Sequence, residues 1–401
     1  MSSQPKVVLA FSGGLDTSFC VKYLAEDRGY EVYSVLVDTG GFSEEELQAI
    51  EANAYALGVK HHTAVSKTRE YYEDCLKYLI FGNILKNNTY PLSVSAERIF
   101  QAVAVAEYAR EIGAQAIAHG STGAGNDQVR FDMAFRIIAP EAEIITPIRD
   151  LKLSREAEIE YLTQKGVQRD WKKAEYSINK GLWGTSVGGK ETLTSQKYLP
   201  ETAWPTPVSK TEEETITLTF EKGELVGLNG ETLTPVQAIQ KLTELAQPFG
   251  IGRDIHVGDT IIGIKGRVGF EAAAPLIIIK AHHTLEKHVL TEQQLYWKEQ
   301  LANWYGSLLH KGQFVEPVMR NIETFLTDTQ AHVTGQVHVR LAPYRFYVEG
   351  IESPYDLMSS VFGSYGEMNN AWTGDDVRGF SKVASNQVMI YQKVSELAEK
   401  N

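Results

Sequence analysis

Cysteine is scarce in this sequence, and long apolar runs are absent. Cys20 and Cys75 are the two cysteines among 401 residues, and no C-x-x-C pair occurs. A disulfide framework, a zinc ribbon and a dithiol redox centre are therefore excluded, and a reducing compartment is indicated. No stretch approaches the roughly 18 apolar residues of a membrane span, and the first residues lack a signal peptide's apolar core. We expect a cytoplasmic protein with no membrane partner.

Positive charge is also in short supply. The chain has 39 Lys and Arg against 51 Asp and Glu, which gives a formal charge of −12, and it contains no basic run. Binding to a nucleic-acid backbone depends largely on neutralising phosphates, so we predict no nucleic-acid partner. Small anionic ligands are not excluded, because a local site can hold them. The length and the 43% hydrophobic content indicate a globular chain with two or three domains.

Apolar runs alternate with helical stretches from Lys6 to about Gly166. Strands are expected at residues 7–11, 31–37, 61–65, 115–118 and 143–145, and helices at 17–28, 44–57, 71–79, 97–112 and 154–166. This alternation predicts an α/β fold, a Rossmann-like parallel sheet covered on both faces. Ligands of such sheets bind at the carboxyl ends of the strands.

The pattern changes near residue 169 into an α+β one. Strands are expected at residues 215–220, 260–264 and 276–280, and helices at 236–245 and 290–309. The last residues carry an apolar stripe at helical spacing, made of Val383, Ala384, Val388, Tyr391, Val394 and Ala398. We predict a nucleotide-binding domain over residues 1–168, a second domain over 169–380 and a C-terminal helix over 381–401. The stripe packs either on its own domain or on another subunit.

A glycine-rich loop, Ser12-Gly13-Gly14-Leu15-Asp16-Thr17-Ser18, falls between the first predicted strand and the first predicted helix. Backbone N–H groups converge at such a helix end, and two adjacent glycines let the main chain approach an anion closely. The hydroxyls add further donors. The loop therefore indicates a phosphate cradle, with an ordinary strand-to-helix turn as the alternative.

A second polar loop, HGSTGAGNDQVRF, follows the strand predicted at residues 115–118. Its amide, carboxylate and guanidinium, on Asn126, Asp127 and Arg130, could meet both charged groups of an amino acid. The alternative is a helix capped by Asn126 or Asp127.

The first loop resembles the pyrophosphate-binding loop of the ATP pyrophosphatases, or PP-loop family. Together with HGSTGAGNDQVRF, Tyr90, Ser95, Tyr176-Ser177 and the LWGTS segment at 182–186, it makes most of the chain similar to the argininosuccinate synthase family. The resemblance implies an adenine nucleotide alpha hydrolase-like domain followed by a synthetase and multimerisation domain. It also implies a ligase of arginine biosynthesis. ATP adenylates citrulline, pyrophosphate leaves, and aspartate displaces AMP to give argininosuccinate. Mg²⁺ would accompany ATP, and the protein would be a homotetramer.

The resemblance also assigns site residues. For ATP they are Ala10, Phe11, Ser12, Gly13, Gly14, Leu15, Asp16, Thr17, Ser18, Val37 and Gly120. For aspartate they are Thr122, Asn126 and Asp127, and for citrulline Tyr90, Ser95, Asn126, Arg130, Ser177, Ser186 and Phe270. Asp16 could help place Mg²⁺ or cap a helix. No catalytic side chain is assigned, and no metal site of the chain's own is expected, because His282, His283 and His288 have poor ligand spacing.

The sequence departs from the family pattern around the citrulline site. The family's citrulline-contacting glutamate falls on Gly258 and its tyrosine on Phe270, while Val94 replaces a common threonine. A buried ammonium needs an acceptor. Asp259 or Glu271 could supply one to citrulline, or the substrate could be an N-acylated citrulline, such as N-acetyl- or N-succinylcitrulline. Another PP-loop synthetase and a noncatalytic nucleotide-binding module are further alternatives.

Overall fold

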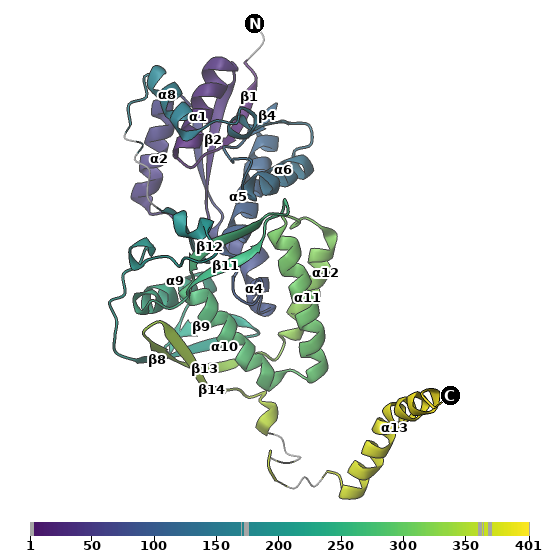
Figure 1. Cartoon of the computed structure of the whole chain (residues 1–401). Coiled ribbons are helices and arrows are strands. Elements are labelled where there is room, and N and C mark those ends of the chain that lie inside the picture. The colour runs from purple at the N-terminus through teal and green to yellow at the C-terminus, as the bar shows by residue number, and fades with distance from the viewer. Residues whose placement is uncertain are drawn as a thin grey trace. The chain divides into compact units, whose positions relative to one another are not determined.

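The computed structural model of the chain (Figure 1) describes residues 4–169, 171, 176–359, 363, 365–367 and 371–400. The described residues fall into two compact units, residues 1–353 and 354–401, and each is taken by itself. Residues 170 and 172–175, beside the predicted domain boundary, lie outside the described residues, as does residue 401 at the end of the predicted tail helix.

A five-stranded parallel sheet organises the first part of the larger unit. Its order is β3-β2-β1-β4-β5, with β1 Lys6–Ala10, β2 Glu31–Asp38, β3 His61–Ser66, β4 Ala116–Ala118 and β5 Glu143–Ile145. Because successive side chains of a strand point to opposite faces, Val7 and Leu9 enter one core and Val8 the other. The predicted parallel sheet, covered on both faces, is confirmed.

Helices cover both faces of this sheet. They are α1 Leu15–Lys22, α2 Glu44–Leu57, α5 Ser93–Glu111, α6 Asp127–Ile138, α7 Pro147–Asp150 and α8 Arg155–Gln164. The helix predicted at residues 71–79 is instead divided into α3 Thr68–Tyr71, a π-helical turn Tyr72–Leu76 and α4 Lys77–Phe81. Cys20 and Cys75 are both buried and unpaired.

Two antiparallel sheets build the rest of the larger unit. One has the order β10-β9-β8-β13-β14, with β8 Glu214–Glu221, β9 Glu224–Leu228, β10 Glu231–Thr232, β13 Gly335–Ala342 and β14 Arg345–Glu352. The other has the order β11-β12-β7-β6, with β6 Ser177–Gly181, β7 Gly184–Gly188, β11 Arg253–Asp259 and β12 Lys265–Glu271. The helices are α9 Pro235–Ala246, α10 Ala273–Val289, α11 Glu292–His310 and α12 Pro317–Thr329.

Two predicted strands are wrong. Residues 260–264 form the turn between β11 and β12, in which Gly263 has φ +86°, and residues 276–280 lie inside α10. The run Leu276-Ile277-Ile278-Ile279 has the β-branched composition of a strand. A short buried apolar run has the same composition in a helix, so composition alone cannot separate the two.

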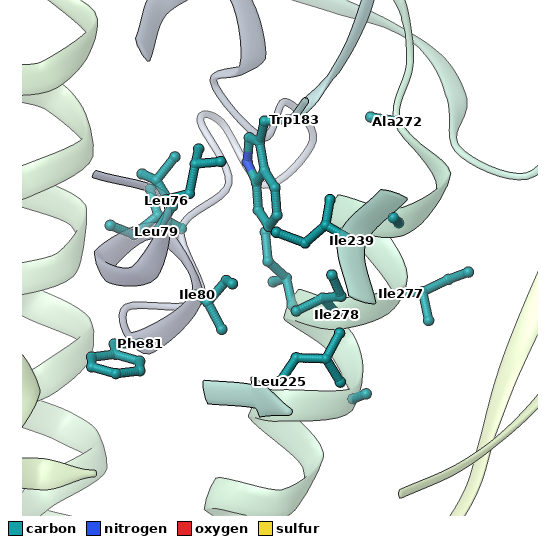
Figure 2. Close-up of a cluster of buried hydrophobic side chains, with 14 of the residues drawn as sticks. Leu76, Leu79, Ile80, Phe81, Trp183, Leu225, Ile239, Ala272, Ile277 and Ile278 are labelled. Atoms are coloured by element: carbon teal, nitrogen blue, oxygen red, sulfur yellow. The ribbon is translucent and has the colours of Figure 1, made fainter. Parts of the chain in front are cut away.

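The isoleucines of α10 belong to the main core of the second half. Figure 2 shows Trp183 between Leu76 and Leu79 on one side and Ile239 and Ile278 on the other. The indole of Trp183 also donates to the carbonyl oxygen of Pro91 at 2.9 Å. This core therefore joins the β6–β7 hairpin to the chain that leads into α5.

The smaller unit contains one long helix, α13 Gly374–Ala398, which begins at a capping box between Thr373 and Asp376. The predicted apolar stripe lies on it, and Phe380, Val383 and Tyr391 are each more than 70% exposed within the single chain. No helix in the described part of the chain is long and apolar enough to cross a membrane.

A buried ion pair crosses the core of the second half. Lys298 and Glu286 are 2% and 0% exposed, and Lys298 Nζ lies 2.8 Å from Glu286 Oε2 and 2.6 Å from the carbonyl oxygen of Phe81. Asn83 and Gln330 donate to the same carboxylate. Removing the cation would leave a buried charge without its counter-ion.

We expect Lys298→Met to lower the free energy of unfolding by about 3–5 kcal/mol in urea denaturation. The matched control is Lys287→Met, because Lys287 lies on α10 but is exposed. Its effect should stay within about 0.5 kcal/mol. Equal effects of the two substitutions would show that the buried pair contributes nothing.

Candidate active site

The glycine-rich loop joins β1 to α1 at the carboxyl edge of the parallel sheet. Gly13 has φ +74°, in the region that favours glycine, and Gly14, rather than Asp16, occupies the N-cap of α1. The hydroxyl of Ser18 donates to the carbonyl oxygen of Gly14 at 2.7 Å. The first N–H groups of α1 are therefore presented by a loop that the Ser18 hydroxyl holds in place.

A cavity of about 900 Å³ lies over this loop. The predicted site residues that line it are Ala10, Phe11, Ser12, Gly14, Leu15, Asp16, Thr17, Val37, Gly120, Thr122, Asp127 and Ser177. Ser18 is fully buried, and a Cβ on Gly13 would lie 3.3 Å from Ile50, so these two residues support the loop from within the fold.

The second loop follows β4 on the neighbouring strand. His119 Nδ1 accepts from the N–H of Ser121 at 3.1 Å, and Nε2 lies 3.0 Å from Asp132, which also pairs with Arg149. The helix offered as the alternative does begin at Asp127, but the side chain of Asn126, at the N-cap position, makes no capping hydrogen bond. Instead, Asn126 Oδ1 accepts from the N–H of Ile261, in the β11–β12 turn, at 2.8 Å. The loop is thus fixed from both ends.

A second, smaller cavity of about 210 Å³ adjoins the second loop. Tyr90, Ser95, Asn126, Arg130 and Ser186, all predicted for citrulline, line it together with Gly258. Ser177 instead lines the larger cavity, and Phe270 is fully buried, with its ring centroid 5.4 Å from that of Tyr90. Asp127 lines both cavities and so lies on the wall between them.

Two guanidinium groups hold the Asp127 carboxylate. Arg98 Nε lies 3.2 Å from Oδ2, and Arg130 Nη1 lies 2.9 Å from Oδ1. Arg130 also donates to the hydroxyl of Ser95 and to the carbonyl oxygen of His310. Most of its fork is therefore engaged within the protein, which leaves little of it for a ligand's carboxylate.

Several residues at the site were missed by sequence reasoning. Arg98, Glu97 and Gln101 line the larger cavity from the middle of α5, and His256 and His310 line the smaller one. Burial raises the pKa of Glu97, which accepts from Thr39 and Gln101. The charged pair Glu97-Arg98 among apolar neighbours was the available signal, because burying such groups is costly unless they are paired.

Neither carboxylate proposed to replace the family's glutamate faces the smaller cavity freely. Asp259 lies at its border, but its side chain is 65% exposed and pairs with Lys265 at 2.6 Å. Glu271 is fully buried and lines a third cavity of about 180 Å³. The space beside Gly258 is taken by His256, whose Nε2 would lie 2.5 Å from a Cβ at that position.

Two segments from the two halves of the larger unit, β6 and the chain at Gly41, come close together beside the larger cavity. Ile178, Asn179 and Lys180 of β6 line the cavity together with residues of the glycine-rich loop. A Cβ on Gly41 would lie 2.4 Å from the carbonyl oxygen of Lys180, so only glycine permits this contact.

A parallel sheet with two anion-suited loops on adjacent strands defines the nucleotide-binding α/β enzymes. Within that class, residues 6–168 match the Arginosuccinate synthase N-terminal HUP domain, and residues 176–391 match the Arginosuccinate synthase C-terminal domain. The chain therefore belongs to the argininosuccinate synthase family. It is an ATP-using ligase that forms a carbon–nitrogen bond, as the motifs predicted.

Relatives agree over nearly the whole chain. The argininosuccinate synthase of Methanocaldococcus jannaschii is 40% identical over 388 residues, which cover 96% of this chain and 97% of the relative. That of Xanthomonas campestris pv. campestris is 36% identical, covering 98% of this chain and 100% of the relative. That of Dictyoglomus thermophilum is 36% identical, covering 96% and 97%.

A buried carboxyl lies beside Asp16 of the glycine-rich loop. Glu158 of α8 is 3% exposed, and its Oε2 has no hydrogen-bond partner among the described residues. Burial, and next the Asp16 carboxylate, raise the pKa of Glu158 from 4.5 to about 8. Because this pKa exceeds the unfolded value, protonation of Glu158 stabilises the fold fully below pH 4.5, and this contribution is lost as the pH rises through about 8.

Glu158→Gln should therefore raise the free energy of unfolding at pH 9 by about 2 kcal/mol relative to the natural chain, and change it little at pH 5. Urea denaturation at both pH values measures the difference. Glu160→Gln, on an exposed position of the same helix, should show no such pH dependence. A shift of the same size at both pH values would mean that Glu158 is ionised throughout.

Proposed function

We propose that the larger cavity binds ATP and aspartate and that the smaller one binds citrulline. One observation carries this assignment. Most of the residues assigned to nucleotide and aspartate line the larger cavity, and most of those assigned to citrulline line the smaller one, which Asn126 also lines. Asp127 borders both cavities. The ureido group of citrulline would thus reach the α-phosphate of ATP from across the second loop.

The chemistry follows in two steps. The ureido oxygen attacks the α-phosphorus of ATP, the bond to the β-phosphate oxygen breaks, and pyrophosphate leaves with the electron pair. The free α-amine of aspartate then attacks the ureido carbon of the citrullyl-adenylate, and AMP leaves. The N–H groups at the start of α1 and the hydroxyls of Ser12 and Thr17 hold the phosphates. Asp127 binds the ammonium group of aspartate, which must lose a proton before the free amine attacks. Positioning and charge stabilisation suffice for such phosphoryl chemistry.

We further assign Asp16 to Mg²⁺, which neutralises phosphate charge when bound. Its carboxylate is the acidic group of the glycine-rich loop that lines the larger cavity, and oxygen ligands suit this cation. We place the enzyme in the cytoplasm, in accord with its two unpaired cysteines. We divide the chain into a nucleotide-binding domain to residue 168, a synthetase domain to 380 and a tail helix.

Exchange of labelled pyrophosphate into ATP tests this function. It should require citrulline but no aspartate, whereas AMP should form only when all three substrates are present. Exchange without any citrulline compound would contradict the proposal, because a different group would then be adenylated.

Asp127→Asn should raise the KM for aspartate about 10–100-fold, because a charged partner of the ammonium is lost. Citrulline-dependent pyrophosphate exchange without aspartate should continue. Glu141→Gln, which changes an exposed carboxylate just beyond α6, serves as the control. An unchanged aspartate KM would remove Asp127 from the aspartate site.

We also propose a homotetramer in which the apolar stripe of α13 packs on a neighbouring subunit. The exposed Val383, Val388 and Tyr391 of this stripe support the proposal, since such a stripe is costly to leave in water. Deleting residues 381–401 should lower the mass measured by light scattering below that of a tetramer. Replacing Lys382 and Gln387 of the same helix by alanine should not. A truncated chain that stays tetrameric would refute this role.

A further inference from the structure

His256 is an imidazole of the smaller cavity to which the motifs assign no role. It lies on β11 and is 6% exposed. Its ring stacks on that of Tyr90, with centroids 5.1 Å apart and an interplanar angle of 25°. This stacking fixes the plane of the imidazole at the wall of the cavity that Tyr90 also lines.

Gly258 gives this ring its place. Residues 256 and 258 point to the same face of β11, and a Cβ on residue 258 would lie 2.5 Å from Nε2 and 3.1 Å from Cε1 of the imidazole. Only glycine at residue 258 leaves room for the Nε2 edge of the His256 ring in this position. Because His256 and Gly258 both line the smaller cavity, this edge borders the ligand space.

The environment of Nδ1, the second ring nitrogen of His256, indicates which of the two nitrogens carries the hydrogen. Nδ1 is buried and has no hydrogen-bond partner in the described part of the chain. Burial, and next Lys86, lower the pKa of His256, so the ring is neutral near pH 7 and carries one N–H. A buried N–H without an acceptor is rarer than an unsatisfied acceptor, which favours the tautomer with hydrogen on Nε2. The cavity edge is then a donor.

The surroundings of the donor favour negative charge. Two arginines, Arg130 and Arg267, and two carboxylates, Asp127 and Asp259, line the same cavity. Both carboxylates are already paired, Asp127 with Arg98 and Arg130, and Asp259 with Lys265. Burial lowers the pKa of His310 to about 4, and Arg130 and Lys86 both contribute to this shift. Burial acts against every charged group, but the positive charges of Arg130 and Lys86 act against cations alone, so they also disfavour an ammonium here. The ligand group that meets His256 should therefore be an anionic acceptor.

We propose that Nε2–H of His256 donates to a carboxylate of the citrulline-type substrate, and that His256 and Gly258 together set the specificity of this end of the site. The inference rests on the proposed assignment of the smaller cavity to citrulline. The carboxylate is either the α-carboxylate of citrulline or one carried by an acyl group on its nitrogen.

Calorimetric binding to the full chain tests the donor with four ligands: citrulline, citrulline amide, N-acetylcitrulline and N-succinylcitrulline. His256→Phe keeps a ring on Tyr90 but removes the donor, and His256→Gln keeps a donor. We expect His256→Phe to weaken the ligand with the recognised carboxylate about 10–100-fold, and His256→Gln to restore most of that loss. The KM for ATP should stay within about twofold. Val257→Ala, at an outward-facing neighbour that is 53% exposed, should change nothing.

The ligands identify the carboxylate. A loss for citrulline but not for its amide assigns the α-carboxylate, and a loss for the succinyl but not the acetyl compound assigns the acyl carboxylate. Affinities that are unchanged, or that fall equally for all four ligands, overturn the proposal. The function itself is judged separately. If the natural enzyme releases no pyrophosphate from ATP with aspartate and any of the four compounds, the proposed function fails, while the binding data still decide the role of His256.

Discussion

The geometry of the site depends on one constraint, the burial of the two ends of α5 in two different cores. Ala96 and Ile99 belong to the large core of the second half, while Ala102, Val105 and Ala109 pack under the parallel sheet. The helix, labelled in Figure 1, contacts β1 and α6 in the first part of the larger unit and β7 and α11 in the second part. A helix of 19 residues is about 28 Å long and rigid. The two cavities therefore cannot move apart without unpacking a core.

The first two turns of α5 connect this constraint to the chemistry of the site. Ser95 reaches Arg130 in the smaller cavity, and Arg98 reaches Asp127 on the wall shared with the larger one. One guanidinium from α5 and one from its own helix thus fix the position of the Asp127 carboxylate. The overall charge of −12 has little bearing on this local balance, since paired charges and backbone N–H groups set the potential that a ligand meets.

The sequence predicts what is local or periodic. The parallel sheet follows from alternating apolar runs, and the two loops follow from glycines and polar residues after strands β1 and β4. Residues 276–280 went wrong because a buried helix and a buried strand share β-branched composition, and tertiary packing decides between them. At the site, Ser186 and Tyr90 are brought together by strands and helices far apart in the chain. His256 and Glu158 carried no motif, because their importance comes from what surrounds them once the chain has folded.

The close approach of Gly41 to Lys180 has an evolutionary consequence. At most ligand-contacting positions, an inherited change alters one contact and leaves the others in place. An alanine at residue 41 would instead push the β6–β7 hairpin away from the parallel-sheet half. The distance between two bound reactants would then increase. We therefore expect residue 41 to remain glycine, although glycine has no side-chain group with which to hold a ligand. The distance between the reacting groups thus depends on a residue that contributes only by having no side chain.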